Sequence, residues 1–399
     1  MNKRNLFSFV WLLALGTVSL PAQTKQAKKI GDFIESTSYN EHKRGAERTL
    51  QYYPEGDDFV CINGKNRFTR ALYGSWSPFR LETSDRPVFA AYDKRNSKHI
   101  RFLLQGRGLT VALDSIEFCE ARYTAGRRTY LLKDAALGKG TLSVSVLAFP
   151  DADGAVWKFS AKDLAEGMVL RCFISEIRAK KLSRNGDMGA DPPGCFEAPE
   201  KPQKQKEYDL PLTDEAYLVL ENLDLKLVSL DEGRRLYQKA EDARKALASR
   251  IRFTTPDPYF NTLGGALAVA ADGIWDGQVW LHGAVGWRMP LSGWRAAYTG
   301  DALGWHDRAR KHFDAYAASQ VTDVPNTIPH PAQDSALHLA RSVKKWGTPQ
   351  YSNGYICRNP RRNNQMHHYD MNLCYIDELL WHFNWTGDLD YARQMWPVI

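Results

Sequence analysis

The sequence predicts a multidomain β + α fold: an antiparallel β-sandwich, a linker helix and then a domain of helical hairpins. Three observations predict it. Residues 55–228 carry short apolar runs between turn residues, residues 231–250 combine helix formers with alternating charges, and the C-terminal third has helical periodicity. The expected boundaries are a leader at 1–22, a lead-in at 23–54, the sandwich at 55–228, the linker helix at 229–252 and the helical domain at 253–399.

The first part is predicted to be a sandwich because its apolar runs are short and several alternate with a period of two. Such runs lie at 101–104, 109–113, 141–147 and 155–159, separated by glycine-rich or Asp-rich turns. Repeated short strands at this spacing favour an antiparallel sandwich over a parallel sheet. Residues 183–206, rich in Gly, Pro and Lys, are expected to form a loop or insertion.

A short motif recurs in the helical part, as Tyr-Thr-Gly-Asp at 298–301 and Trp-Thr-Gly-Asp at 385–388. Glycine readily ends a helix in the left-handed conformation, and aspartate accepts hydrogen bonds from the unpaired N–H groups that begin the next helix. The motif therefore predicts the tight turn of a helical hairpin. Its recurrence predicts stacked hairpins.

The polarity of these helices predicts which end of the domain binds a ligand. A long irregular loop precedes each helix that ends at the motif, at 276–289 and at 321–369. If the hairpins pack in parallel, both long loops lie on one face and both tight turns on the opposite face. Long loops in a compact domain usually serve binding.

The chain also stops about three turns into a new helix, so we expect it to be truncated.

The N-terminus has the three parts of a secretory leader. Lys3 and Arg4 precede an apolar run at 6–20, and Ala22 offers a small residue for cleavage. We therefore expect an exported protein, either periplasmic or extracellular. The apolar run is too short for a membrane span and no later stretch is apolar enough, so no membrane span is expected.

The net charge of +7 is scattered along the chain. Nucleic-acid binding needs a clustered basic face, so no nucleic-acid partner is expected. The six cysteines are widely spaced and include no C-x-x-C pair, which argues against a zinc ribbon. We expect no cofactor and no metal.

The first long loop is rich in side chains that suit a saccharide. Residues 275–295 include four tryptophans, two arginines, an aspartate and a histidine. Flat rings suit the faces of sugars, and charged groups suit hydroxyl or carboxylate groups. The expected binding residues are Trp280, His282, Arg288, Trp294 and Arg295, with Asp276 as a candidate catalytic carboxylate. The alternatives are that the tryptophans pack the core and the arginines form structural ion pairs.

The second long loop ends in a polar segment at 363–372. Its expected binding residues are Asn363, His367, His368, Tyr369 and Asn372, and Asp370 is the second candidate catalytic carboxylate. Asp370 also stands where a helix N-cap belongs, which is the structural alternative. Two adjacent histidines are weak grounds for a metal site, so hydrogen bonding to a substrate is the favoured role.

The segments at 63–74 (NGKNRFTRALYG), 79–87 (FRLETSDRP) and 281–298 look like those of a poorly characterised group of secreted bacterial proteins. With its sandwich, linker helix and Thr-Gly-Asp hairpins, the chain resembles the six-hairpin glycosidases. This resemblance implies a partial (α/α)6 toroid with a glycoside hydrolase site in its mouth, where an acid and a base cleave a plant or host polysaccharide or oligosaccharide. One or both catalytic carboxylates could then lie beyond Ile399. Residues 286–294 lack the acid of rhamnosidase-like members, which argues against that activity.

Two alternatives stay open. A polysaccharide lyase would use a Tyr or His base and an Asn or Arg against a uronate carboxylate, and the two long loops contain all four residue types. In such lyases the toroid precedes the sandwich, whereas here it follows. The second alternative is a carbohydrate-binding protein without catalytic activity.

Overall fold

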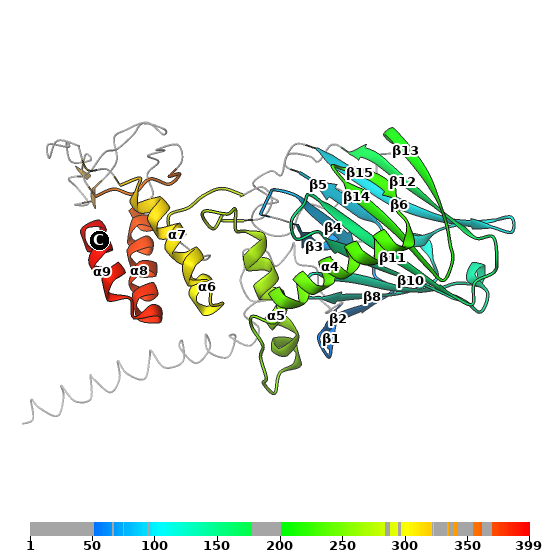
Figure 1. Ribbon diagram of the computed structural model, residues 1–399, viewed down its shortest axis with the longest axis horizontal. Coiled ribbons are helices and arrows are strands. Elements are labelled where there is room, and N and C mark those ends of the chain that lie inside the picture. The colour runs from blue at the N-terminus through cyan, green and yellow to red at the C-terminus, as the bar shows by residue number, and fades with distance from the viewer. Residues whose placement is uncertain are drawn as a thin grey trace, which may run out of the picture. The chain divides into compact units, whose positions relative to one another are not determined.

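The computed structural model describes residues 52–399 except 66–67, 75, 94–95, 178–200, 284–287, 294–296, 321, 323–332, 335–338, 341–353 and 361–368. The predicted leader at 1–22 and the lead-in as far as residue 51 lie outside the described residues. Within the described part, strands fill the first half and helices the second, with helix α4 (Leu230–Ala248) between them (Figure 1). None of the described helices is both long enough and apolar enough to cross a membrane.

Two antiparallel sheets make up the β part. The first has the strand order β1 (Tyr53–Glu55), β2 (Asp58–Ile62), β8 (Phe118–Thr124), β9 (Arg127–Lys133), β10 (Thr141–Ala148), β11 (Gly154–Lys162), β14 (Glu215–Glu221), β15 (Asp224–Leu227). The second has the order β13 (Gln203–Pro211), β12 (Val169–Ile177), β6 (Ser97–Gly106), β5 (Phe89–Tyr92), β4 (Arg80–Ser84), β3 (Phe68–Tyr73), with β7 (Leu109–Ala112) paired to β6. The predicted runs at 101–104, 141–147 and 155–159 all lie within these strands.

The core of the sandwich is built by side chains that alternate along the strands. In β8, for example, Cys119, Ala121 and Tyr123 are buried while the residues between them are partly exposed. At its centre the ring of Phe89 makes edge-to-face contacts with the rings of Phe102 and Trp157, with centroids 5.8 and 5.4 Å apart. The period of two in the sequence therefore corresponds to side chains that alternate between the core and the surface. The predicted antiparallel β part is confirmed.

The prediction of a loop over 183–206 is wrong at its C-terminal end. Residues from Gln203 onward form β13, which pairs in antiparallel register with β12. Most side chains of β13 are exposed, so the strand has no apolar alternation from which it could have been predicted. Main-chain hydrogen bonding to β12 determines its conformation instead.

Helix α4 begins at Ser229, whose Oγ accepts a hydrogen bond from the backbone N–H of Glu232. The alternating charges predict an exposed helix, but one face is buried against β10, β11 and β14. Gly233 touches the ring of Tyr217, and Glu241 is buried between Arg127 and Arg244, at 3.0 and 2.6 Å. The helix is therefore docked on the first sheet.

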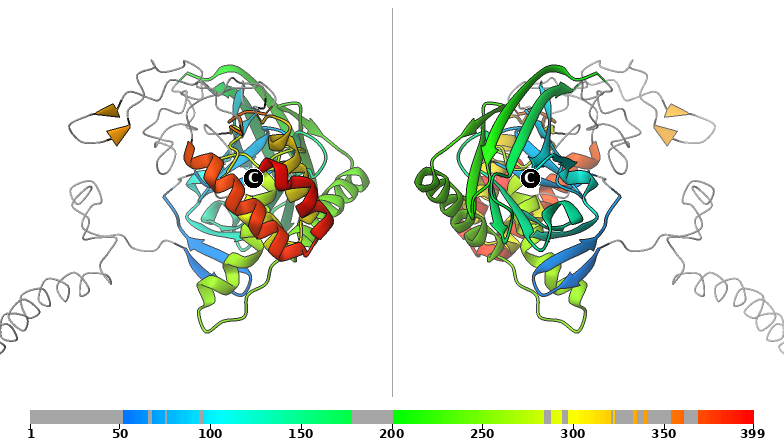
Figure 2. Two further views of the ribbon diagram at one scale, coloured as in Figure 1. Left: turned by 90° about the vertical axis from the view of Figure 1, so that its left-hand side faces the viewer. Right: turned by 90° about the vertical axis from the view of Figure 1, so that its right-hand side faces the viewer.

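The helical part contains α5 (Pro258–Gly273), α6 (Ala297–Ala302), α7 (His306–Ala317), α8 (Tyr369–Thr386) and α9 (Leu389–Met395), with a small hairpin of β16 (Gln333–Asp334) and β17 (Leu339–Ala340). The predicted start of α5 is confirmed, because Asp257 accepts a hydrogen bond from the N–H of Tyr259 at 2.8 Å and Pro258 occupies the first turn. Figure 2 shows α8 and α9 side by side, and they contact each other as a hairpin.

The two Thr-Gly-Asp motifs adopt different structures. The second is the predicted turn: α8 ends at Thr386, Gly387 has a φ of +64°, and Asp388 accepts a hydrogen bond from the N–H of Tyr391 at 2.9 Å. The prediction for the first is wrong, because α6 continues through Gly300 and Asp301. The chain turns instead at Gly304, where φ is +72°.

The segment ending in α6 runs parallel to α8. Gly293 lies against Cys374, the Tyr298 hydroxyl donates to Asp377 at 2.6 Å, and Asp301 meets His382 at 2.9 Å. The partner numbers rise together, so the two segments point the same way, as the parallel arrangement of hairpins requires. The described helices do not by themselves make a ring, and the toroid stays a prediction.

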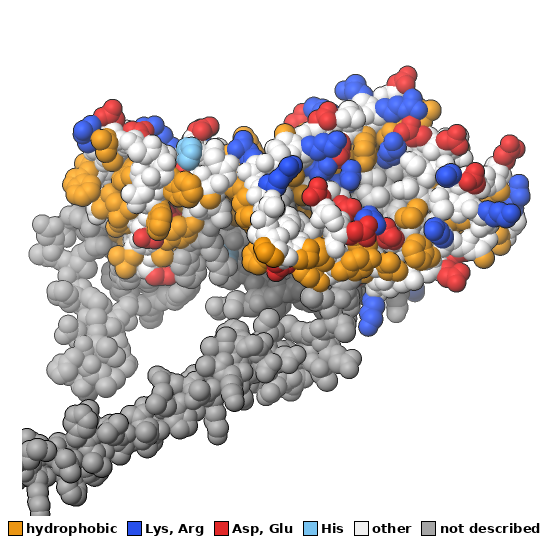
Figure 3. All heavy atoms as spheres, turned by 90° about the horizontal axis from the view of Figure 1, so that it is seen from below, with side chains coloured by type: hydrophobic (Ala, Val, Ile, Leu, Met, Phe, Trp, Pro, Cys, Tyr) orange, Lys and Arg blue, Asp and Glu red, His pale blue; other side chains and the backbone are white. Residues whose placement is uncertain are grey.

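One face of α8 exposes apolar side chains to solvent. Its members share the helical spacing of one stripe and are Leu373, Leu380, Trp381 and Trp385. Figure 3 shows hydrophobic side chains gathered at the surface of the helical part. We call this set the α8 apolar stripe.

Candidate functional site

The first long loop is folded around Asp276. Its Oδ1 accepts hydrogen bonds from the backbone N–H groups of Gln278 and Val279, at 3.0 and 2.9 Å. Two isolated β-bridges, Trp275 to Trp280 and Leu281 to Pro290, extend this folded segment. The carboxylate of Asp276 therefore has a fixed orientation in an Asx turn.

Arg288 ties this loop to a turn of the sandwich. Its two terminal nitrogens donate to the carbonyl oxygens of Gly273, at 3.2 Å, and Trp76, at 2.7 Å. Burial lowers the pKa of Arg288, and the charge of nearby Asp276 acts in the opposite direction. The loop that carries Asp276 and Arg288 is thus bonded both to the end of α5 and to a turn of the sandwich.

Trp76, with 50% of its surface exposed, is an accessible ring beside this loop. It meets Trp275 edge-on, with centroids 6.5 Å apart, and the guanidinium of Arg308 lies 5.3 Å from its centroid. Arg308 is itself held by Asp272 at 2.7 Å. An exposed indole ring held in place by Arg308 is a suitable surface for a sugar face. Local sequence patterns do not predict this role, because Trp76 lies in a turn between β3 and β4.

Trp280 occupies the core of the helical part rather than its surface. It is 1% exposed and packs against Trp275, with ring centroids 4.7 Å apart. Its backbone N–H donates to Nδ1 of His312 at 3.2 Å, and burial lowers the pKa of His312 to about 4. The neutral imidazole of His312 therefore accepts this hydrogen bond at Nδ1 and holds the first long loop against the core of the helical part. In this structure Trp280 has the packing role that was the alternative to sugar binding.

The second long loop meets the first. Asn372 accepts a hydrogen bond from the N–H of Ile356 at 2.7 Å and donates to its carbonyl at 3.2 Å, which holds the loop on α8. The side chain of Arg358 reaches the sulfur of Met289 in the first loop. The described parts of the two long loops therefore lie on one face, as the helix polarity predicts.

The remaining predicted site residues differ in their exposure, and several lie outside the described part of the chain. Asp370 is exposed in the first turn of α8, after the helix has begun, and His282 is half-buried with its backbone N–H bonded to the carbonyl of Met289. The predicted residues that lie outside the described part are Trp294, Arg295, Asn363, His367, His368 and the side chain of Tyr369.

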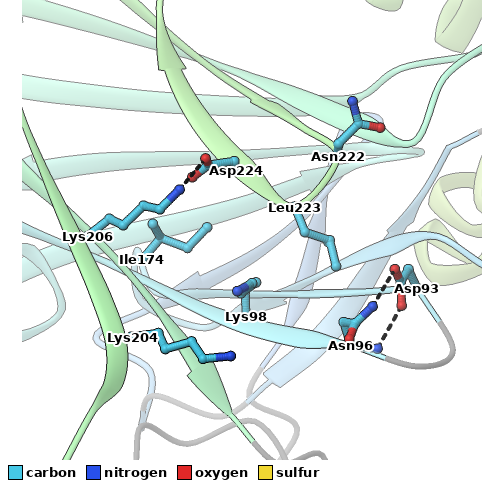
Figure 4. A pocket seen from close by; sticks show the side chains of 9 residues that line it. All are labelled: Asp93, Asn96, Lys98, Ile174, Lys204, Lys206, Asn222, Leu223 and Asp224. Atoms are coloured by element: carbon cyan, nitrogen blue, oxygen red, sulfur yellow. Dashed lines mark hydrogen bonds and ion pairs between the residues drawn. The ribbon is translucent and has the colours of Figure 1, made fainter.

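A separate cavity of about 300 Å³ lies on the sandwich (Figure 4). Three of the residues that line it are lysines, but each is already paired: Lys98 and Lys204 with Glu176, and Lys206 with Asp224. The other lining residues are Asp93, Asn96, Ile174, Asn222 and Leu223. The lining has no aromatic ring for sugar stacking and its lysine charges are neutralised, so the loop face is the better candidate.

Comparison with known proteins gives a partial match. Residues 96–232 match a family profile described as "Domain of unknown function (DUF4450)", which covers much of the sandwich and the start of α4. No curated protein matches the sequence. Among solved structures, a bacterial glucoamylase in complex with acarbose is similar with a TM-score of 0.37 and 9% identity. The match covers 66% of this chain and 55% of the glucoamylase, so this chain spans about half of that protein.

Proposed function

We propose that this protein is a secreted glycoside hydrolase, or the N-terminal part of one, whose substrate is a polysaccharide or oligosaccharide. The observation that supports the proposal is the meeting of the two long loops on one face, where Arg358 touches Met289. That face carries Asp276, Arg288 and the exposed ring of Trp76.

Asp276 and Asp370 are the proposed catalytic carboxylates. Hydrolysis of a glycosidic bond needs one carboxyl group to protonate the leaving oxygen and a second to act as base or nucleophile. Asp276 suits a reaction that needs a fixed geometry because two backbone N–H groups hold its Oδ1. Asp370 lies in the first turn of α8, at the end from which the second loop enters.

Arg288 and Trp76 are proposed to bind the sugar. Stacking on Trp76 would orient one face of the ring, and Arg308, stacked beside it, limits the movement of the indole. Arg288 would place a positive charge beside Asp276 and a sugar hydroxyl or carboxylate.

The test is an assay of the purified chain against a panel of plant and host glycans, with reducing ends as the readout. Asp276→Asn keeps an oxygen that accepts the two N–H bonds but removes the charge. We expect it to lower kcat by about 100-fold or more while leaving the melting temperature almost unchanged. Asp390→Asn, at an exposed acid of α9, is the matched control and should keep full activity.

Three results would count against the proposal. The first is a folded protein that releases no reducing sugar from any glycan. The second is an Asp276→Asn variant with the same activity as the parent. Release of an unsaturated uronide instead of a hydrolysis product would identify a lyase.

A further inference from the structure

Three potential metal ligands converge at the end of the helical part that lies away from the long loops. Nδ1 of His306 is 2.7 Å from Oδ1 of Asp301, and Nδ1 of His382 is 2.9 Å from both carboxylate oxygens of Asp301. They come from three elements: α6, the start of α7 and the C-terminal half of α8. One ligand atom from each residue can be chosen so that all three lie within 4.8 Å of one another.

The cluster is closed on one side and open on the other. Asp301 and His382 are 5% and 2% exposed, whereas the side chain of His306 is 45% exposed. The rings of Phe313 and Tyr391 pack on His382, with centroids 5.5 and 5.6 Å away. A buried carboxylate therefore faces two imidazoles inside an aromatic wall, and solvent reaches it past His306.

We propose that Asp301, His306 and His382 bind one divalent first-row transition metal ion, such as Zn²⁺. Two imidazole nitrogens and one carboxylate oxygen are a donor set that such ions accept, with solvent in the remaining position. Bonds of 2.0 to 2.2 Å place the ligand atoms of a tetrahedral ion about 3.3 to 3.6 Å apart. The two nitrogen-to-oxygen separations, 2.7 and 2.9 Å, are shorter than this. Metal binding therefore requires the ligands to move apart, and the exposed His306 is the one best able to move outward.

The ion would hold three helices together. Asp370 and His382 are separated by 12 residues of α8, or about 18 Å along the helix axis. The metal would therefore join α6, α7 and α8 at the end away from the long loops, and its binding is independent of the proposed hydrolase activity.

The test uses the chain without a histidine tag, because added histidines would bind the same ions. The protein is stripped with a chelator, dialysed and titrated with Zn²⁺ by calorimetry, and metal content is measured by mass spectrometry. We expect one Zn²⁺ per chain, a higher melting temperature with the metal, and weaker binding at acidic pH because the imidazoles must be neutral to coordinate. Substitution with Co²⁺ should give visible absorption from nitrogen and oxygen ligands.

His306→Gln is the deciding variant, because its side chain is exposed and its loss leaves the buried pair of Asp301 and His382 intact. It should weaken Zn²⁺ binding at least tenfold. Asp307→Asn, at the next position and also exposed, should bind like the parent. Absence of stoichiometric Zn²⁺ binding would mean that the three residues form a hydrogen-bonded cluster only. Unchanged binding by His306→Gln would place the ion on other histidines of the chain. Either result overturns the proposal.

Discussion

The ring of Trp280 packs directly on the backbone of Gly300. A Cβ atom at position 300 would lie 2.3 Å from the Cη2 atom of the ring, which is closer than real contacts allow. The glycine of the first Thr-Gly-Asp motif is therefore required by a side chain 20 positions earlier, whereas the glycine of the second is required by its backbone angle.

Gly300→Ala should destabilise the helical part. Alanine is the better helix former by about 1 kcal/mol, so a loss of stability would come from the clash with Trp280. We expect a decrease of about 1 to 3 kcal/mol in the free energy of unfolding, measured by urea denaturation. An increase in stability would contradict the contact.

Gly387→Ala is the matched control for this prediction. A Cβ atom at position 387 would meet no other atom, but the φ of +64° is strained for alanine. We therefore expect the free energy of unfolding to fall by about 1 kcal/mol because of the backbone conformation alone. Combining each substitution with Trp280→Phe separates the two causes. The smaller ring should offset part of the loss at Gly300 and none of the loss at Gly387.

Arg288→Ala should loosen the first long loop. The substitution removes hydrogen bonds to the carbonyls of Gly273 and Trp76, which connect the loop to the sandwich. Amide hydrogen exchange should become faster in peptides from 276–290 and around Trp76. Arg288→Lys should restore this protection only in part, because an ammonium group does not reproduce the two-nitrogen fork. Arg393→Ala, at an exposed pair, should leave exchange in both regions unchanged.

Stability should fall as the pH is lowered from about 6.5 towards 4. Burial lowers the pKa of His99 and of His312 to about 4, from an ordinary value of 6.5. Between these values the unfolded chain binds protons that the native protein excludes, so acid favours unfolding by up to about 3 kcal/mol per histidine. Above pH 6.5 both states are neutral at these positions, and the contribution stays constant.

Urea unfolding at pH 7.5, 6.5, 5.5 and 4.5 measures this dependence. The lowered pKa of Glu215, about 2, reduces stability mainly below its ordinary value of 4.5, so the histidines dominate the slope between pH 6.5 and 5.5. His99→Gln should remove about half of the slope. A flat profile in the parent protein would contradict the buried neutral state of both histidines.

The α8 apolar stripe should promote self-association of this chain. Replacing Leu373, Trp381 and Trp385 together with glutamine should lower the sedimenting mass at high protein concentration. It should change the melting temperature little, because all three side chains are exposed. Leu379→Gln, on the buried face of the same helix, should instead unfold the helical part. Equal self-association of the triple variant and the parent would show that the stripe is not responsible.

Local sequence patterns were enough wherever one segment determines its own structure. The strands of the sandwich follow from alternation, the start of α5 from Asp257 and Pro258, and the turn after α8 from Gly387 and Asp388. In each case the hydrogen-bond partner or the backbone angle belongs to the same few residues.

The remaining features depend on residues far apart in the chain. The first motif has the same Thr-Gly-Asp letters as the second, yet the carboxylate of Asp301 meets two imidazole rings, those of His306 at the start of α7 and of His382, 81 positions later. Trp76 enters the candidate site through Arg288, which is 212 positions away. Strand β13 forms because β12 offers a partner edge. Such pairings are set by tertiary contacts that local periodicity does not encode.

The charges of β13 have a further consequence for the sandwich. This strand ends its sheet, and Lys204, Lys206, Glu207 and Asp209 crowd its exposed surface. A foreign extended peptide that joined there would have to strip water from several ionised groups before gaining main-chain bonds. The edge of the second sheet at β13 is thereby disfavoured for strand pairing with another chain, so we expect this edge not to contribute to aggregation at high concentration.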